Sequence, residues 1–261
     1  MYSLRLIWAF LKVNLQQALA YRADTALSIV LNLLWLGWEL VSLQIIFNNT
    51  SDLSGWGMGE LIALLGVWRL TNTLMAALIW PNTERFNAAV RDGSFDYSLL
   101  QPVNSQFLVS FSRIVIWRVW EVLLAGVLVA VGITISESIV TLTSVLRFLL
   151  LSASGMMVLY SLWIVMIAFT FWFVKFDNNV TILQALMDAG RYPVTIYPAW
   201  LRLIVTFIIP IAVATTVPLQ ALRGDLNGAQ VLMFLGISAA SVFISSQVWR
   251  AGVKRYSGAS A

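Results

Sequence analysis

The sequence predicts an all-α integral membrane protein with six transmembrane helices. We also expect an N-terminal amphipathic helix in the membrane interface and a short cytoplasmic helix between spans two and three. Of the 261 residues, 60% are hydrophobic and only 11% are charged, whereas soluble domains average roughly 45–50% and 25%. Apolar runs of about 20 residues recur along the chain, and most lysines and arginines lie at their ends. The whole of 1–261 therefore reads as one transmembrane domain.

The composition also excludes several kinds of chemistry. The chain contains neither histidine nor cysteine, so disulfides, thiolate nucleophiles, histidine bases and zinc sites of the usual kind are ruled out. We expect no catalytic, cofactor-binding or metal-binding residues. The net charge of +4 comes from basic residues scattered at helix ends, which predicts contact with membrane lipid and no nucleic-acid partner.

The first segment, 1–22, has the pattern of an amphipathic helix. Leu4, Ile7 and Leu11 recur at helical spacing, while Arg5 and Lys12 fall on the other face. This pattern predicts a helix lying in the membrane interface. A helix packed on another protein is the alternative.

Hydropathy then places the six spans and the loop that separates the second from the third. Pro210 lies in the middle of the fifth span, where it removes a backbone hydrogen bond and predicts a kink. The spans are 23–47, 58–80, 114–133, 148–173, 199–217 and 229–249, and the loop is 81–103.

The distribution of lysine and arginine gives the orientation, because these residues accumulate on the cytoplasmic side. One side holds Arg5, Lys12, Arg22, Arg85, Arg91, Lys175, Arg191, Arg250, Lys254 and Arg255, with Arg113 and Arg202 near it. The other side holds only Arg147 and Arg223. We therefore expect a multi-pass protein of the cell membrane with both termini in the cytoplasm.

The loop 81–103 has the features of a short cytoplasmic helix. Asn82 or Thr83 can cap it and Gly93 can end it, while Phe86 and Val90 are four residues apart and share one face. An exposed helix with such an apolar knob suits docking into a groove of another protein. The alternative is that the loop folds back on its own bundle.

Part of this loop resembles a known family. The string 90–103, VRDGSFDYSLLQPV, is similar to the cytoplasmic loop of type-2 ABC exporter permeases, in their small six-span branch. Further similarities are the amphipathic start, Tyr192-Pro193, Tyr197-Pro198, Pro210, Pro218 and the basic end 250–256.

The resemblance implies a partner. In that family this loop carries the coupling helix that docks on an ATP-binding subunit, which would make Phe86, Val90, Arg91 and Asp92 the contact residues here. Two copies, or this chain and a paralogue, would form the substrate path. ATP and magnesium would be bound by the partner, and the chain itself would not be an enzyme.

The absence of a phosphate-binding loop agrees with such a division of labour, because no G-x-x-x-x-G-K-[ST] occurs in the sequence. A secondary transporter or channel without an ATPase is the alternative from a different class. It would need buried carboxylates for an ion relay, and spans three to six hold few of them. A membrane enzyme and an assembly subunit are further alternatives.

Two opposite charges are expected inside the bilayer. Glu39 lies eight residues before the outer end of span one and Arg69 eleven residues after the outer start of span two. At 1.5 Å per residue their depths are about 12 and 16 Å from the outer face, so neighbouring helices would bring them together. The pair either lines a substrate path or only holds the two spans together.

Overall fold

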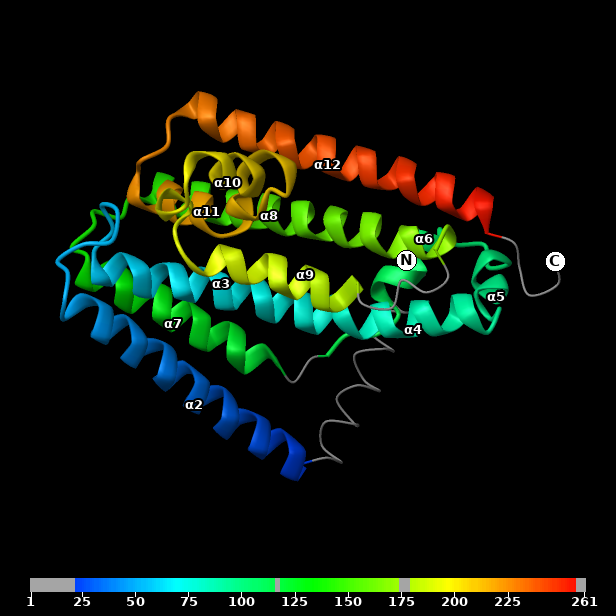
Figure 1. The fold of residues 1–261 in the computed structure, drawn as a ribbon, viewed down its shortest axis with the longest axis horizontal. Coiled ribbons are helices and arrows are strands. Elements are labelled where there is room, and N and C mark those ends of the chain that lie inside the picture. Colours follow the sequence, from blue (N-terminus) through cyan, green and yellow to red (C-terminus); the bar gives the residue numbers. More distant parts are fainter. Residues whose placement is uncertain (1–21, 116–117, 174–178, 257–261) are drawn as a thin grey trace.

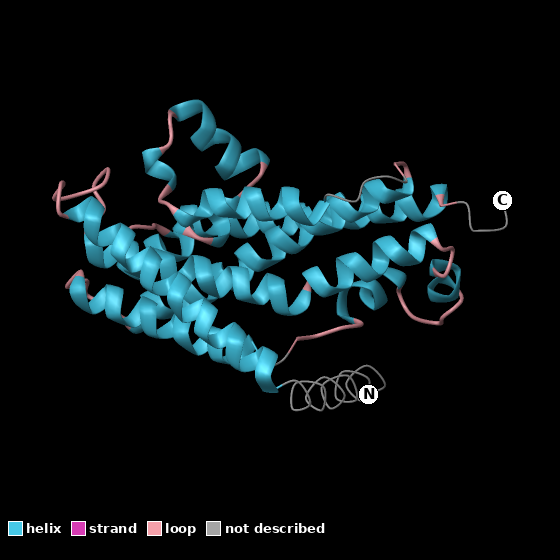
Figure 2. Cartoon of the chain, turned by 60° about the horizontal axis from the view of Figure 1, so that its bottom comes forward, coloured by secondary structure: helices cyan, strands magenta, loops and turns pink. Residues whose placement is uncertain are grey.

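The structure, a computed structural model, describes residues 22–115, 118–173 and 179–256, and Figures 1 and 2 show that this part of the chain is helical. Its only extended pairing is an isolated bridge between Leu53 and Trp56. The all-α class is thereby confirmed. The interfacial helix expected over 1–22 falls almost wholly outside the described residues.

The long helices are α2 (Arg22–Phe47), α3 (Met58–Leu78), α8 (Leu142–Ala168) and α12 (Gly228–Arg255), with α4 (Trp80–Arg91) following α3 after one residue. The shorter elements are α5 (Phe95–Leu99), α6 (Ser105–Phe111), α7 (Val119–Ile135), η2 (Phe169–Phe171), α9 (Asn179–Asp188), η3 (Ala189–Arg191), η4 (Val194–Ile196), α10 (Ala199–Leu203), the π-helical η5 (Ile204–Ile208), η6 (Ile211–Ala214) and α11 (Thr216–Arg223).

Four helices of the described residues are long and apolar enough to cross a membrane: Ala26–Phe47, Met58–Arg91, Leu142–Phe171 and Gly228–Arg255. Two shorter apolar helices, Val119–Ile135 and Ala199–Ile208, accompany them. The chain is therefore a multi-pass membrane protein. The count of six spans stays a prediction.

The long helices run side by side in one elongated bundle, from which α2 diverges (Figure 1). We call the end that carries α5 and the last turn of α12 the α5 end. The opposite end, which carries α11 and the loop 48–57, is the α11 end. Side-chain caps define where two helices start there: Thr141 accepts a hydrogen bond from the Ser144 amide, and Asn227 accepts one from the Gln230 amide.

Glycines let α3 and α7 pack with their backbones in near contact. A Cβ on Gly66 would lie 2.8 Å from the Val129 amide nitrogen, and one on Gly132 would lie 2.3 Å from the Ala63 amide nitrogen. Small residues of this kind allow close helix approach in lipid, where van der Waals packing drives association. Helices α3 and α7 are therefore closely packed over this stretch.

We expected 199–217 to form one continuous helix, the fifth span, and this expectation is wrong. The chain passes through α10, η5 and η6 before α11 begins at Thr216. Pro210 lies between η5 and η6 with a ψ of 58°, outside the helical region. The proline therefore ends the helix where only a kink was expected, because it supplies no amide donor.

The residues before this break run along α3 toward the α11 end. Trp68 in α3 donates its indole N–H to the Met187 carbonyl at 2.9 Å, and Trp56, in the loop before α3, donates to the Thr195 hydroxyl at 3.1 Å. Residues 187–195 thus ascend along α3, from its middle toward the α11 end. The expectation that Arg191 lies on the side of the chain termini is wrong.

After this ascent, 199–223 turns back into the bundle and out again. The carbonyl of Ala214 accepts a hydrogen bond from Thr71, in the middle of α3, at 3.2 Å. At the far end of the segment, Arg223 forms an ion pair of 3.0 Å with Glu60, in the first turn of α3. Non-helical backbone is tolerated at membrane depth only where protein covers it, and residues 210–219 are all buried.

Candidate functional site

The segment that links α3 to α7 begins as a nearly continuous extension of α3. Helix α4 starts at Trp80 with Pro81 in its first turn and ends at Arg91. Gly93 has a φ of +76°, which ends the helix at the position expected from the sequence. Asn82 and Thr83 are inside the helix, so the expectation that one of them caps it is wrong.

Asn82 instead joins α4 to the last turn of α6 and the residues that follow it. Its side-chain amide donates to the carbonyls of Ser110 at 3.0 Å and Arg113 at 2.8 Å. Its amide oxygen accepts from the Ser112 hydroxyl at 2.8 Å. Because Asn82 is 1% exposed, these bonds satisfy a buried polar group and fix the return of the chain toward α7. The sequence carried a signal for this role in a polar residue directly after an apolar run.

Thr83 ties α4 to α8. Its hydroxyl accepts a hydrogen bond of 2.6 Å from the Trp163 indole N–H, and both residues are buried. A tryptophan in a core usually finds such a partner for its N–H. The first turn of α4 is thus held by two neighbouring segments.

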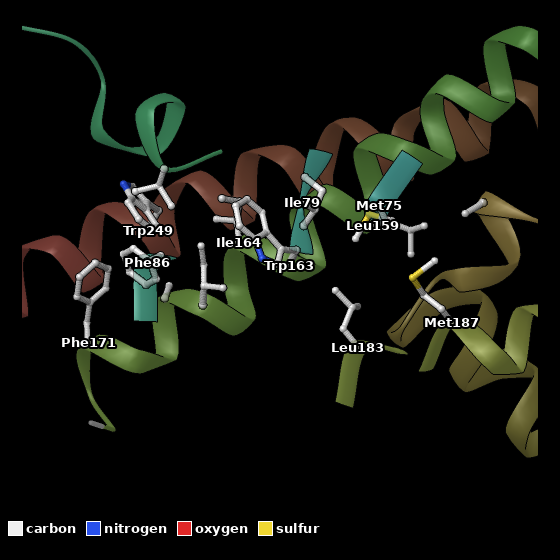
Figure 3. Packing of buried hydrophobic residues seen from close by; sticks show 14 of the residues in the cluster. Met75, Ile79, Phe86, Leu159, Trp163, Ile164, Phe171, Leu183, Met187 and Trp249 are labelled. Atoms are coloured by element: carbon white, nitrogen blue, oxygen red, sulfur yellow. The ribbon is translucent and has the colours of Figure 1, made fainter. Parts of the chain in front are cut away.

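Phe86 lies in the core of the chain itself and is only 2% exposed. Its ring packs within 5.4–5.5 Å, between ring centroids, of Phe95, Phe171 and Trp249, which come from α5, η2 and α12. Figure 3 shows Phe86 between Phe171 and Trp249. The expectation that Phe86 is an exposed knob is wrong, because these rings bury it. We call Phe86, Phe95, Phe171 and Trp249 the aromatic cluster.

The surface that α4 and α5 leave open lies beyond the aromatic cluster. Arg91 and Asp92 are exposed and Val90 is half-buried. Tyr97 is 73% exposed and Leu100 is 82% exposed, so α5 and the residue after it also present two large side chains to the surface. Hydrogen bonds from Ser94, through its side chain and its amide, lower the pKa of Asp92. Its carboxylate therefore stays ionised at neutral pH.

Tyr256, directly after α12, packs against the aromatic cluster with its ring centroid 5.3 Å from that of Phe95. Burial raises the pKa of its hydroxyl, and the negative charge of Asp96 adds to the effect. The phenol is therefore neutral at neutral pH. The C-terminal end of α12 thus packs together with α5 and η2.

Glu39 and Arg69 lie in contact in the bundle. The Arg69 guanidinium donates to one carboxylate oxygen of Glu39 through Nε at 2.8 Å and through a terminal nitrogen at 2.6 Å. Its other terminal nitrogen donates to the Asn32 amide oxygen at 2.9 Å. Both charged side chains are largely buried, at 8% and 12% exposed.

A third charge joins this pair from a distant part of the chain. Arg191 in η3 forms an ion pair with the second carboxylate oxygen of Glu39, and its guanidinium lies 4.9 Å from the centre of the Trp68 ring. Sequence reasoning missed Arg191 because it placed this residue outside the membrane. We call Glu39, Arg69 and Arg191 the charge cluster.

The described part of the chain holds few buried acidic side chains. Within the described part of the chain, no group of three acidic side chains is arranged to hold a metal ion. The buried carboxylates there are Glu39 and Glu121, and Arg118 neutralises Glu121 at 3.0 Å.

A family model described as ABC-2 family transporter protein matches residues 33–260 of the chain. The match includes both regions described above and nearly all of the helical bundle. Comparison with curated proteins and with solved structures gives no match.

Proposed function

The chain belongs to the ABC-2 transporter family, and from this membership we propose that it is the permease subunit of an ATP-driven exporter, powered by a separate ATP-binding subunit. Its place as a membrane component of an ABC transporter follows from the family. The export direction and the docking contact are the proposal.

The observation that carries this proposal is the surface of α4 and α5. Helix α4 adds 12 residues beyond α3, or about 18 Å at 1.5 Å per residue, so its last turn and α5 form a surface at the α5 end of the bundle. It exposes Arg91 and Asp92 at the end of α4, and Tyr97 and Leu100 in and after α5. Tyrosine and arginine are typical anchors at protein interfaces.

The docking residues are therefore revised from the first expectation. Arg91 and Asp92 remain candidates because they are exposed, and Val90 is half-buried beside them. Tyr97 and Leu100 take the place of Phe86 as apolar anchors. Phe86 supports the surface from below, through the aromatic cluster.

We further propose six crossings with both termini in the cytoplasm of a multi-pass cell-membrane protein. The crossings are α2, α3, α7, α8, the ascent from α9 through η4, and α12. The surplus of lysine and arginine at the α5 end supports this orientation. The same family resemblance supports a second copy, or a paralogue, as the other half of the substrate path.

The ion pairs favour this function over an ion-coupled carrier. A proton or sodium relay needs carboxylates that can exchange their ion. Glu39 is held by two arginines, and Glu121 is held by Arg118. ATP hydrolysis in a partner supplies the energy without such a relay.

The test is capture of the ATP-binding subunit by Leu100→Ala and Tyr97→Ala chains. Loss of an interface anchor costs about 2 kcal/mol, or roughly thirtyfold in affinity. Leu142→Ala is the matched control, because Leu142 is 76% exposed at the opposite end of the bundle. Equal capture by all variants would refute the docking surface.

A further inference from the structure

A cavity of about 200 Å³ adjoins the charge cluster, between α2, α3 and η3. Its walls include Leu43, Ile46 and Leu61 on the apolar side, and Ser42, Glu39, Arg191 and Tyr192 on the polar side. Ile46 is one residue from the end of α2 and Glu39 is eight residues from it, a difference in depth of about 10 Å at 1.5 Å per residue. The cavity therefore leads from the membrane interface at the α11 end down to the charge cluster.

The charges beside this cavity do not balance. Two guanidinium groups share one carboxylate, which leaves a surplus of one positive charge at membrane depth. Asp188, three residues before Arg191, forms no ion pair in the described part of the chain. An uncompensated charge in a low-dielectric site is costly, so a bound anion would stabilise the cluster.

Arg191 has the geometry to meet that anion. Its side chain is 35% exposed, compared with 12% for Arg69. Arg69 uses all three guanidinium nitrogens on Glu39 and Asn32. Among the described residues, Glu39 is the single hydrogen-bond partner of Arg191, so the remaining N–H groups of Arg191 are available to a ligand in the cavity.

A second arginine of the same chain has the opposite balance of charge around it. Arg223 lies 4.8 Å from the centre of the Trp56 ring, much as Arg191 lies on Trp68. It pairs with two acids, Glu60 and Asp225, each at 3.0 Å. Its surroundings carry a surplus negative charge and offer nothing to an anion.

We propose that the cavity binds the phosphate-bearing headgroup of an amphiphile that carries a net negative charge. In this proposal, Arg191 and the Tyr192 hydroxyl bind the phosphate. The apolar part of the amphiphile next to the headgroup lies along the apolar wall, which is formed by Leu43, Ile46, Leu61 and Leu65. About 200 Å³ equals the volume of about seven waters, which suits a headgroup and leaves acyl chains in the surrounding lipid. Planar guanidinium groups are well matched to phosphate.

The experiment is native mass spectrometry of the full chain, with the subunits that co-purify, in the presence of phosphatidylglycerol or phosphatidylcholine. We expect the unmodified protein to retain phosphatidylglycerol in preference. Arg191→Gln should weaken this binding at least tenfold, whereas Arg223→Gln, the matched control, should leave it unchanged. Ser42→Leu should also block binding, because it fills the cavity from α2 and keeps every charge.

Glu39→Gln distinguishes binding from a merely structural role. This change removes the acid that competes with the ligand, so affinity for phosphatidylglycerol should rise. Soluble glycerol phosphate is the second arm: binding as tight as that of the lipid would identify a water-borne phosphate as the ligand, and no binding would identify the lipid. Equal retention of both lipids, or equal losses in Arg191→Gln and Arg223→Gln, would overturn the proposal.

Discussion

Replacing Phe86 by alanine should destabilise the chain strongly. The ring is 2% exposed and touches three aromatic partners at centroid distances of 5.4–5.5 Å. Truncating a buried phenylalanine costs about 3–5 kcal/mol, and each aromatic pair contributes about 0.5–1.5 kcal/mol beyond its buried area. For a chain of this length, such a loss lowers the melting temperature by on the order of 10 °C.

Melting curves in detergent measure this effect, with Tyr97→Ala as the control because Tyr97 is 73% exposed. A surface change of that kind alters stability by about 0.5 kcal/mol or less. Phe86→Leu should fall between the two, since it keeps most of the apolar volume. If Phe86→Ala melted like the unmodified chain yet failed to capture the ATP-binding subunit, the aromatic cluster would not be its environment, and Phe86 would be a docking residue.

Two further predictions concern the charge cluster and the ascent of the chain. Glu39→Gln leaves two arginines without their carboxylate and should lower the free energy of unfolding by about 3–5 kcal/mol. The double change of Glu39→Gln with Arg69→Met should lower it by less than the sum of the two single changes. Strictly additive shifts of the melting temperature would show that the two side chains do not interact. Because the chain lacks cysteine, Asn49→Cys and Ala199→Cys should react with an impermeant thiol reagent in intact cells, and Gln101→Cys only after permeabilisation. Protection of Ala199→Cys until permeabilisation would instead restore a fifth span over 199–217.

The sequence was sufficient to predict the long helices. The expected spans 23–47, 58–80 and 229–249 lie within a few residues of α2, α3 and α12, because apolar runs bounded by polar residues fix where such helices begin and end. The prediction failed over 199–217. That run is as apolar as a span, but its second half, 210–217, is apolar because protein buries it, and hydropathy alone cannot distinguish this from contact with lipid.

Four of the six prolines, Pro193, Pro198, Pro210 and Pro218, lie in this run or within six residues of its ends, and they were the signal against a single helix. Each removes a backbone donor and restricts the residue before it. Their spacing leaves no run of 20 residues free of proline between 193 and 218. Read together, they would have indicated short helical pieces.

The two candidate sites differed in how well they could be predicted. The contact between Glu39 and Arg69 followed from matched depth on neighbouring helices. Arg191 could not be found that way, because its partner lies 152 residues away and nothing local links them. Phe86 was misread since an amphipathic helix face looks the same whether it covers its own bundle or another protein.

The charge cluster also has a consequence for how the chain enters the membrane during synthesis. Glu39 leaves the ribosome 30 residues before Arg69 and 152 residues before Arg191. A lone carboxylate at the centre of a helix resists transfer into lipid by about 2.5–3.5 kcal/mol. We expect α2 to remain beside the translocon until α3 arrives, so that the two helices partition as a hairpin and the third charge closes the cluster only after Arg191 has also been synthesised.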